Sequence, residues 1–229
     1  FKTDRLEVGG NFRAKDVPDM GYNAAMKYTA KGYADPTKAV VDALSKEEPT
    51  ELKAMDGKIY TFKWDAEAGN YTYTVKGTEE TGTFNPDDGA AALKAITGSV
   101  LQDIELVKDA AHPTTVNTLY GTVTFTWTEA TADVHPYGEG KAYFAYTYKL
   151  TDSLENINSL KQGSDSISES IEVSAGAFGS EAKHNIKVEI KGTNDRPEIS
   201  AVVLTDESGT RFDYFDSSAE LAKKAGSET

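Results

Sequence analysis

Apolar and polar residues alternate with a period of two along residues 122–128, where valine, phenylalanine and tryptophan stand between threonines. Successive side chains of an extended strand point to opposite faces, so this alternation predicts a strand with one buried face. β-Branched and aromatic residues fill the pattern, and Gly, Asn and Asp separate its recurrences. It recurs at residues 60–64, 71–75, 144–150, 167–173 and 186–190. Many short strands of this kind predict an all-β chain built from β-sandwiches.

Three short helices are predicted between these strands. Asp35–Pro36 and Asn85–Pro86 each offer an N-cap residue and a first-turn proline ahead of spaced apolar residues. Gly98 is placed to end the second helix. A third, weaker helical pattern runs from Ser153 to Gly163.

An internal repeat governs the predicted domain organisation. Residues 71–136 and residues 146–197 share an order of tyrosine-rich strand, helix, two strands and a closing proline. We interpret them as two related modules in preference to one elaborated domain.

The predicted boundaries divide the chain into four parts: residues 1–56, 57–136, 137–199 and 200–229. The middle two parts are the predicted β-sandwich modules. In the first part, Gly9–Gly10 and Gly21 indicate turns rather than a long strand, and this part completes the first module or belongs to a preceding one. The last part begins a following module or forms a C-terminal tail.

The charge balance narrows the class of partner. Lys and Arg number 24 and Asp and Glu 37, which gives a net charge of −13. Such a surface repels phosphate backbones and anionic lipid, so we expect no nucleic-acid partner and no direct membrane insertion. No run approaches 18 apolar residues, and the chain has no Cys. Outside the cell, a hard cation held by carboxylates would be the alternative to disulfides as a stabiliser.

Residues 186–199 carry a family resemblance. Their sequence, Ile-Lys-Val-Glu-Ile-Lys-Gly-Thr-Asn-Asp-Arg-Pro-Glu-Ile, resembles the module end of VCBS repeats and related cadherin-like repeats of giant bacterial surface proteins. That family closes each unit with an alternating strand followed by Gly-Thr-Asn-Asp-x-Pro. The resemblance extends over about residues 143–199. It is weaker over residues 57–136, because residues 131–136 depart from the terminal motif. Residues 1–50 show no such resemblance.

The resemblance implies tandem Ig-like or cadherin-like β-sandwich modules with a few short helices. It also implies an extracellular or bacterial cell-surface location, export by type I secretion, and a role in cell adhesion and biofilms. The expected partners are neighbouring modules of the same chain and a glycan or protein receptor on a host or another surface.

The same resemblance implies calcium as the bound ion, held where modules join. Calcium takes six to eight oxygen ligands, which carboxylates from two adjoining modules can supply. The candidate metal ligands are Asn194, Asp195, Asp206, Glu207, Asp152 and Asp133. The alternative is that Asn194 and Asp195 only form an Asx-type turn that ends the preceding strand.

Other candidate sites have ordinary structural interpretations. Residues 65–70 look like an acidic calcium loop but are typical of a hairpin turn, and the acids of residues 85–89 suit the first turn of a helix. Trp64 and Trp127 lie on alternating strands and are expected in the core. The three histidines share no metal-ligand spacing: His112, His135 and His184.

No nucleophile elbow, zinc-protease motif, phosphate loop or dinucleotide fingerprint is present in the sequence, and we expect no enzymatic activity. The predicted function is that of a repeat segment of a large extracellular adhesin, a calcium-stiffened extender or adhesive module. The alternatives are a carbohydrate-binding module and an accessory domain of a secreted glycoside hydrolase.

Overall fold

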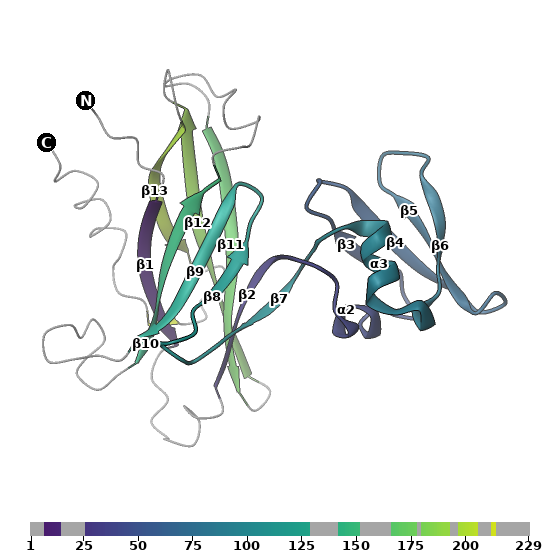
Figure 1. Ribbon diagram of the computed structural model, residues 1–229, viewed down its shortest axis with the longest axis horizontal. Coiled ribbons are helices and arrows are strands. Elements are labelled where there is room, and N and C mark those ends of the chain that lie inside the picture. Colours follow the sequence, from purple (N-terminus) through teal and green to yellow (C-terminus); the bar gives the residue numbers. More distant parts are fainter. Residues whose placement is uncertain are drawn as a thin grey trace, which may run out of the picture. The chain divides into compact units, whose positions relative to one another are not determined.

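The computed structural model describes residues 7–14, 26–128, 142–151, 166–177, 180–192, 197–205 and 212–213. They belong to two compact units, and each has its own core. The smaller unit comprises residues 32–103, and the larger unit comprises the described residues before and after it. The chain therefore leaves the larger unit, builds the smaller one and returns (Figure 1).

The larger unit is built on one long sheet. Its strands are β1 (Glu7–Ala14), β2 (Lys27–Ala34), β7 (Val100–Leu106), β8 (Thr114–Asn117), β9 (Gly121–Thr128), β10 (Tyr143–Leu150), β11 (Ser166–Ala177), β12 (Ser180–Gly192), β13 (Pro197–Thr205) and β14 (Phe212–Asp213). Their order is β13-β12-β11-β2-β8-β9-β10-β1-β14, and β7 pairs with β2. Strands β2 and β7 carry the chain across the division between the units.

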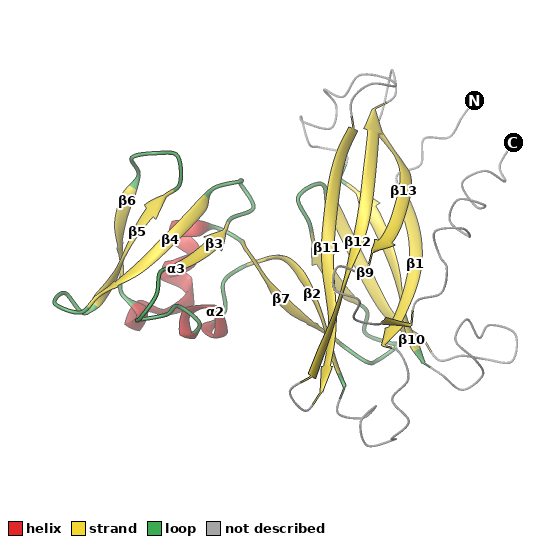
Figure 2. Cartoon of the chain, turned by 180° about the vertical axis from the view of Figure 1, so that it is seen from behind, coloured by secondary structure: helices red, strands yellow, loops and turns green. Residues whose placement is uncertain are grey.

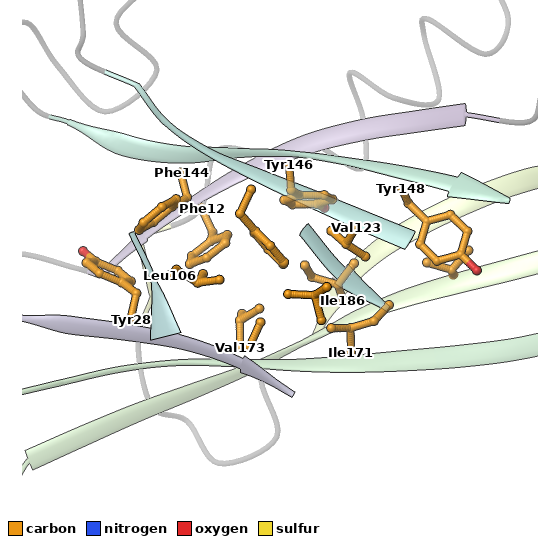
Figure 3. Close-up of a cluster of buried hydrophobic side chains, with 14 of the residues drawn as sticks. Phe12, Tyr28, Leu106, Val123, Phe144, Tyr146, Tyr148, Ile171, Val173 and Ile186 are labelled. Atoms are coloured by element: carbon orange, nitrogen blue, oxygen red, sulfur yellow. The ribbon is translucent and has the colours of Figure 1, made fainter. Parts of the chain in front are cut away.

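The long sheet folds over its own apolar face to enclose the core. Figure 3 shows side chains of β1, β9 and β10 facing those of β2, β11 and β12. Phe12 lies at the centre of an aromatic group, with its ring centroid 5.7 Å from that of Phe144 and 5.9 Å from that of Phe125. The predicted all-β fold class, with a sandwich-like core and few short helices, is confirmed.

The smaller unit has one four-stranded sheet and two short helices. Its strands are β3 (Thr50–Lys53), β4 (Ile59–Asp65), β5 (Asn70–Val75) and β6 (Thr81–Phe84), paired in chain order, and its helices are α2 (Lys38–Asp42) and α3 (Gly89–Thr97), the latter preceded by the 3₁₀ turn η1 (Pro86–Asp88). The helices lie on one face of the sheet (Figure 2). Phe62, Tyr71 and Leu93 are among the buried side chains between the two layers.

The division into units differs from the predicted boundaries. The predicted break at 136/137 separates β9 from β10, which pair along their length, from Thr128 opposite Tyr143 to Gly121 opposite Leu150. The predicted sandwich module 57–136 instead contains most of a sheet that helices cover, followed by strands of the larger unit. The two tyrosine-rich segments taken as a repeat, β5 and β10, belong to different units.

Two glycines that suggested a turn lie in a strand instead. Gly9 and Gly10 are part of β1, opposite Thr147 and Tyr146 of β10. A Cβ atom on Gly10 would lie 2.5 Å from the hydroxyl oxygen of Tyr146, so glycine makes room for that ring. The six alternating segments, by contrast, correspond to β4, β5, β9, β10, β11 and β12, and the first two predicted helices to α2 and to η1 with α3. The third, at residues 153–163, lies outside the described residues.

Polar contacts fasten the first and last residues of the smaller unit to each other. The side-chain amide of Gln102 donates to the carbonyl oxygens of Ala34 and Asp35, at 3.0 and 3.1 Å. The Asp35 carboxylate accepts hydrogen bonds from Lys94 Nζ at 2.6 Å and from Ser99 Oγ at 3.3 Å. The hydrogen bond from Lys94 holds the pKa of Asp35 below its usual value. The entering and leaving strands of this unit are thereby joined at its base.

Candidate functional site

The predicted calcium ligands lie outside the described residues. This holds for Asn194, Asp195, Asp206, Glu207, Asp152 and Asp133. Within the described ranges, no group of three or more His, Asp or Glu side chains is arranged to hold a metal ion. Calcium binding at the module joints therefore stays a prediction.

The acidic loop at residues 65–70 is a hairpin turn, as predicted. Asp65 Oδ1 accepts hydrogen bonds from the backbone amides of Glu67 and Ala68, at 3.0 and 3.1 Å. Gly69 has a φ of +68°, in the left-handed region that favours glycine. The Asp65 carboxylate thus closes the turn between β4 and β5.

The acidic loop at residues 85–89 begins a helix, again as predicted. Asn85 Oδ1 accepts a hydrogen bond of 3.0 Å from the backbone amide of Asp87, which is an N-cap interaction. Pro86 occupies the first turn, and Asp87 and Asp88 lie at its positive end.

Both tryptophans pack against the cores. The Trp127 ring centroid lies 4.9 Å from that of Phe144, and the Trp64 centroid lies 4.9 Å from that of Tyr71. Lys46 Nζ lies over the Trp64 ring, 4.3 Å from its centroid, in a cation–π contact. Both tryptophans are partly buried and pack against the cores rather than lying within them, so the prediction of core positions is confirmed only in part.

The two described histidines have different surroundings. His112 lies in an exposed turn, where its Nδ1 is 2.6 Å from Asp109 Oδ2. This hydrogen bond lowers the pKa of Asp109. His184 is buried in β12. His135 lies outside the described residues.

A pocket of about 680 Å³ opens in the smaller unit. Its buried lining includes Val41, Leu44 and Tyr71, and its exposed lining includes Lys46 and Asp87. The Tyr71 hydroxyl donates a 2.7 Å hydrogen bond to the carbonyl oxygen of Leu44, and burial raises the pKa of that hydroxyl. The volume is in the range of small-molecule sites, roughly 300–1,000 Å³.

The larger unit encloses a buried acid that the sequence reading missed. Glu169 lies in β11 and is 8% exposed. The period-two pattern could have predicted its burial. Glu169, Ile171 and Val173 are alternate residues of one strand and therefore share a face, and Ile171 and Val173 face the core.

Hydrogen-bond donors from two other elements surround the Glu169 carboxyl group. Oε2 accepts from Thr118 Oγ1 at 2.9 Å and from the Tyr148 hydroxyl at 2.6 Å, and Oε1 accepts from the Leu119 amide at 2.6 Å. We call these four residues the Glu169 cluster. Burial raises the pKa of Glu169, although the hydrogen bonds from Tyr148 and Thr118 oppose this effect. Burial, followed by the charge of Glu169, also raises the pKa of Tyr148.

Comparison with protein-family models, with curated proteins and with solved structures gave no match to this chain. In the part of the chain that the structure describes, no helix is both long enough and apolar enough to cross a membrane.

Proposed function

We propose that this chain is a segment of a large extracellular bacterial adhesin, where it carries tension between neighbouring modules of the same protein. Its role is mechanical rather than catalytic. The observation that supports this proposal is the attachment of β1 and β13, which lie at or next to the two ends of the long sheet. β1 pairs with β10 at six positions and β13 pairs with β12 at eight, both antiparallel.

Tension that enters through either flank of the larger unit acts first on these ladders. Each ladder joins a strand near a terminus to an internal strand with buried side chains, such as Tyr146 in β10 and Val188 in β12. Releasing β1 or β13 requires several backbone hydrogen bonds to break and also disturbs the core. Strands attached in this way suit a segment that must not extend under load.

The smaller unit should stay folded under tension until the larger unit has opened. It is inserted between β2 and β7, and these two strands pair with each other, so a load applied at residues 7 and 205 bypasses it. Optical tweezers with handles at those positions should release the length of the larger unit first. Release of residues 32–103 ahead of the larger unit would contradict the tension-bearing role.

Calcium is the cation we propose for the module joints. The net charge of −13 favours a cation, and the resemblance of residues 186–199 to module ends assigns Asn194 and Asp195 as ligands. Extracellular modules bind calcium with dissociation constants of about 10⁻⁴–10⁻³ M, so such sites fill after export.

Millimolar calcium should raise the unfolding midpoint of the larger unit relative to excess EGTA. Ligand at 100 times its dissociation constant adds about 2.7 kcal/mol, which corresponds to roughly 5–10 °C in a unit of this size. Scanning calorimetry of the chain and of Asp195→Asn, with magnesium as the control ion, measures the shift. An unchanged midpoint would contradict calcium binding. The tension-bearing proposal would then still be tested separately, by the optical-tweezers experiment.

The second candidate function is that of a carbohydrate-binding module, which the pocket of the smaller unit favours by its size. The aromatic residue that lines this pocket, Tyr71, is buried. Trp64 is not part of the lining, and Lys46 Nζ lies over its ring. A glycan array, with Trp64→Ala as the comparison, separates this candidate from a purely mechanical segment.

A further inference from the structure

Tyr148 of the Glu169 cluster also stands in the β1–β10 ladder, opposite Val8. The cluster contains none of the predicted calcium ligands. It joins β11 to the β8–β9 turn and to the end of β10, at one end of the core. Figure 3 shows Tyr148 there, with its hydroxyl directed away from the other labelled side chains. The described donors to Glu169, those of Thr118, Leu119 and Tyr148, are all neutral groups.

Thr118 gives this cluster two complete hydrogen-bond arrangements. Its hydroxyl has one proton and two acceptors within reach, Glu169 Oε2 at 2.9 Å and the Gly121 carbonyl oxygen at 3.0 Å. When Glu169 is ionised, the proton of Thr118 points to the carboxylate. The Gly121 carbonyl oxygen still accepts from the Thr118 amide, at 2.9 Å.

When Glu169 is protonated on Oε2, the acid donates to Thr118 Oγ1, and Thr118 turns its own proton to the Gly121 carbonyl oxygen. Tyr148 still donates to Oε2, and the Leu119 amide still donates to Oε1. Protonation therefore leaves each of these groups with a hydrogen-bond partner, although the bonds to the neutral acid are weaker than those to the carboxylate. It also removes the cost of holding a charge away from water.

We propose that Glu169 is a proton-operated lock: the contacts that join β11 to the β8–β9 turn and to β10 contribute more to the stability of the larger unit when Glu169 carries a proton than when it is ionised. The contribution of Glu169 to the stability of the larger unit is then greatest at acidic pH and falls as the pH becomes neutral. This inference concerns the larger unit alone and does not depend on the adhesin role.

The direction of the pH dependence follows from the burial of the acid. Burial raises the pKa of Glu169, so the folded chain holds this proton at pH values where the unfolded chain has lost it. Its stabilisation is complete below the ordinary pKa of glutamate and is lost as pH rises through the raised value. The titratable group that donates to it, Tyr148 of β10, is a phenol whose own pKa is raised by burial. Phenols stay neutral in that range, since their ordinary pKa is about 10.

The test compares the pH dependence of unfolding in the full chain and in Glu169→Gln, which imitates the protonated acid. We divide the unfolding equilibrium constant of the unmodified chain in urea by that of the variant. Between the ordinary pKa of glutamate and the raised pKa of Glu169, this ratio is expected to rise by up to about tenfold per pH unit. Glu172→Gln is the matched control, because Glu172 lies on the same strand, is partly exposed and is within 3.5 Å of Lys183. It should not reproduce the change.

A ratio that stays constant, or that falls as pH rises, would overturn the proposal, because the ionised acid would then be as well accommodated as the neutral one. A second measurement needs no variant. In the unmodified chain labelled with ¹³C-glutamate, one side-chain carboxyl resonance should titrate above all others. If every glutamate carboxyl titrates at or below its ordinary pKa, Glu169 holds no proton and the lock does not exist.

Discussion

Replacing Phe62 with alanine should lower the unfolding free energy of the smaller unit by about 3–5 kcal/mol. Phe62 is fully buried, and its ring centroid lies 5.6 Å from that of Tyr73 and 6.1 Å from that of Phe84. Alanine leaves a cavity that strand β4 cannot close, because it is paired on both sides, with β3 and with β5. For a unit of this size, the loss corresponds to a midpoint lower by roughly 12 °C or more.

Scanning calorimetry should show this shift in one transition only, since the two units have separate cores. Phe125→Ala is the counterpart in the larger unit and should move the other transition. Thr74→Ala, on the exposed face of β5, is the control and should change neither by more than about 0.5 kcal/mol. A single transition that both phenylalanine variants shift equally would show that the units unfold as one.

Replacing Gly121 with alanine should destabilise the larger unit by about 3 kcal/mol, the upper part of the range for overpacked sites. The added Cβ would lie 2.3 Å from the carbonyl oxygen of Lys149 and 2.8 Å from the ring of Tyr148. The carbonyl is backbone of β10, so relief requires β9 and β10 to separate where Gly121 lies opposite Leu150. Urea unfolding followed by tyrosine and tryptophan fluorescence measures the loss.

Gly77→Ala is the matched control for the loss of a glycine. Gly77 has a φ of +78°, and an added Cβ would meet no atom within 4 Å. Its substitution should cost the smaller unit about 1 kcal/mol through backbone strain and leave the larger unit unchanged. Equal losses at the two sites would contradict the close approach of β9 and β10.

The sequence predicted local structure well because alternation is a property of single strands. Thr122 to Thr128 alternates because one face of β9 is buried, and the same parity places Glu169 inside. β1 was missed because its glycines suggest turns when read alone. Only the Tyr146 ring on a strand more than 130 residues away explains why Gly10 is there.

The division of the chain into two units could not be predicted from the sequence for a related reason. Period-two patterns report that strands exist but not which strands pair, and β1 with β10 and β2 with β11 are pairings between distant segments. Tyr71 and Tyr73 resemble Tyr146 and Tyr148 because both pairs serve half-buried strands. The resemblance therefore reflects a shared environment, and the two pairs belong to different units.

The alternation pattern of the sequence could predict that Glu169 is buried, but not which groups form hydrogen bonds with it. That Glu169 meets Thr118, Leu119 and Tyr148 depends on a turn and a strand that are brought together only by the folded sheet. Nothing in the residues beside Glu169 marks its partners.

The fastening of Ala34 and Asp35 to Gln102 also bears on how the chain reaches its native state. Strand β2 must find β11, with Ala30 opposite Val173, across a long intervening stretch of chain. Closing an unstructured loop costs conformational entropy that grows with the logarithm of its length. Once residues 32–103 have folded, their two ends are held together. For the loop-closure entropy of the larger unit, this stretch then counts as a short loop. A smaller unit that folds first therefore reduces the conformational search of the larger one.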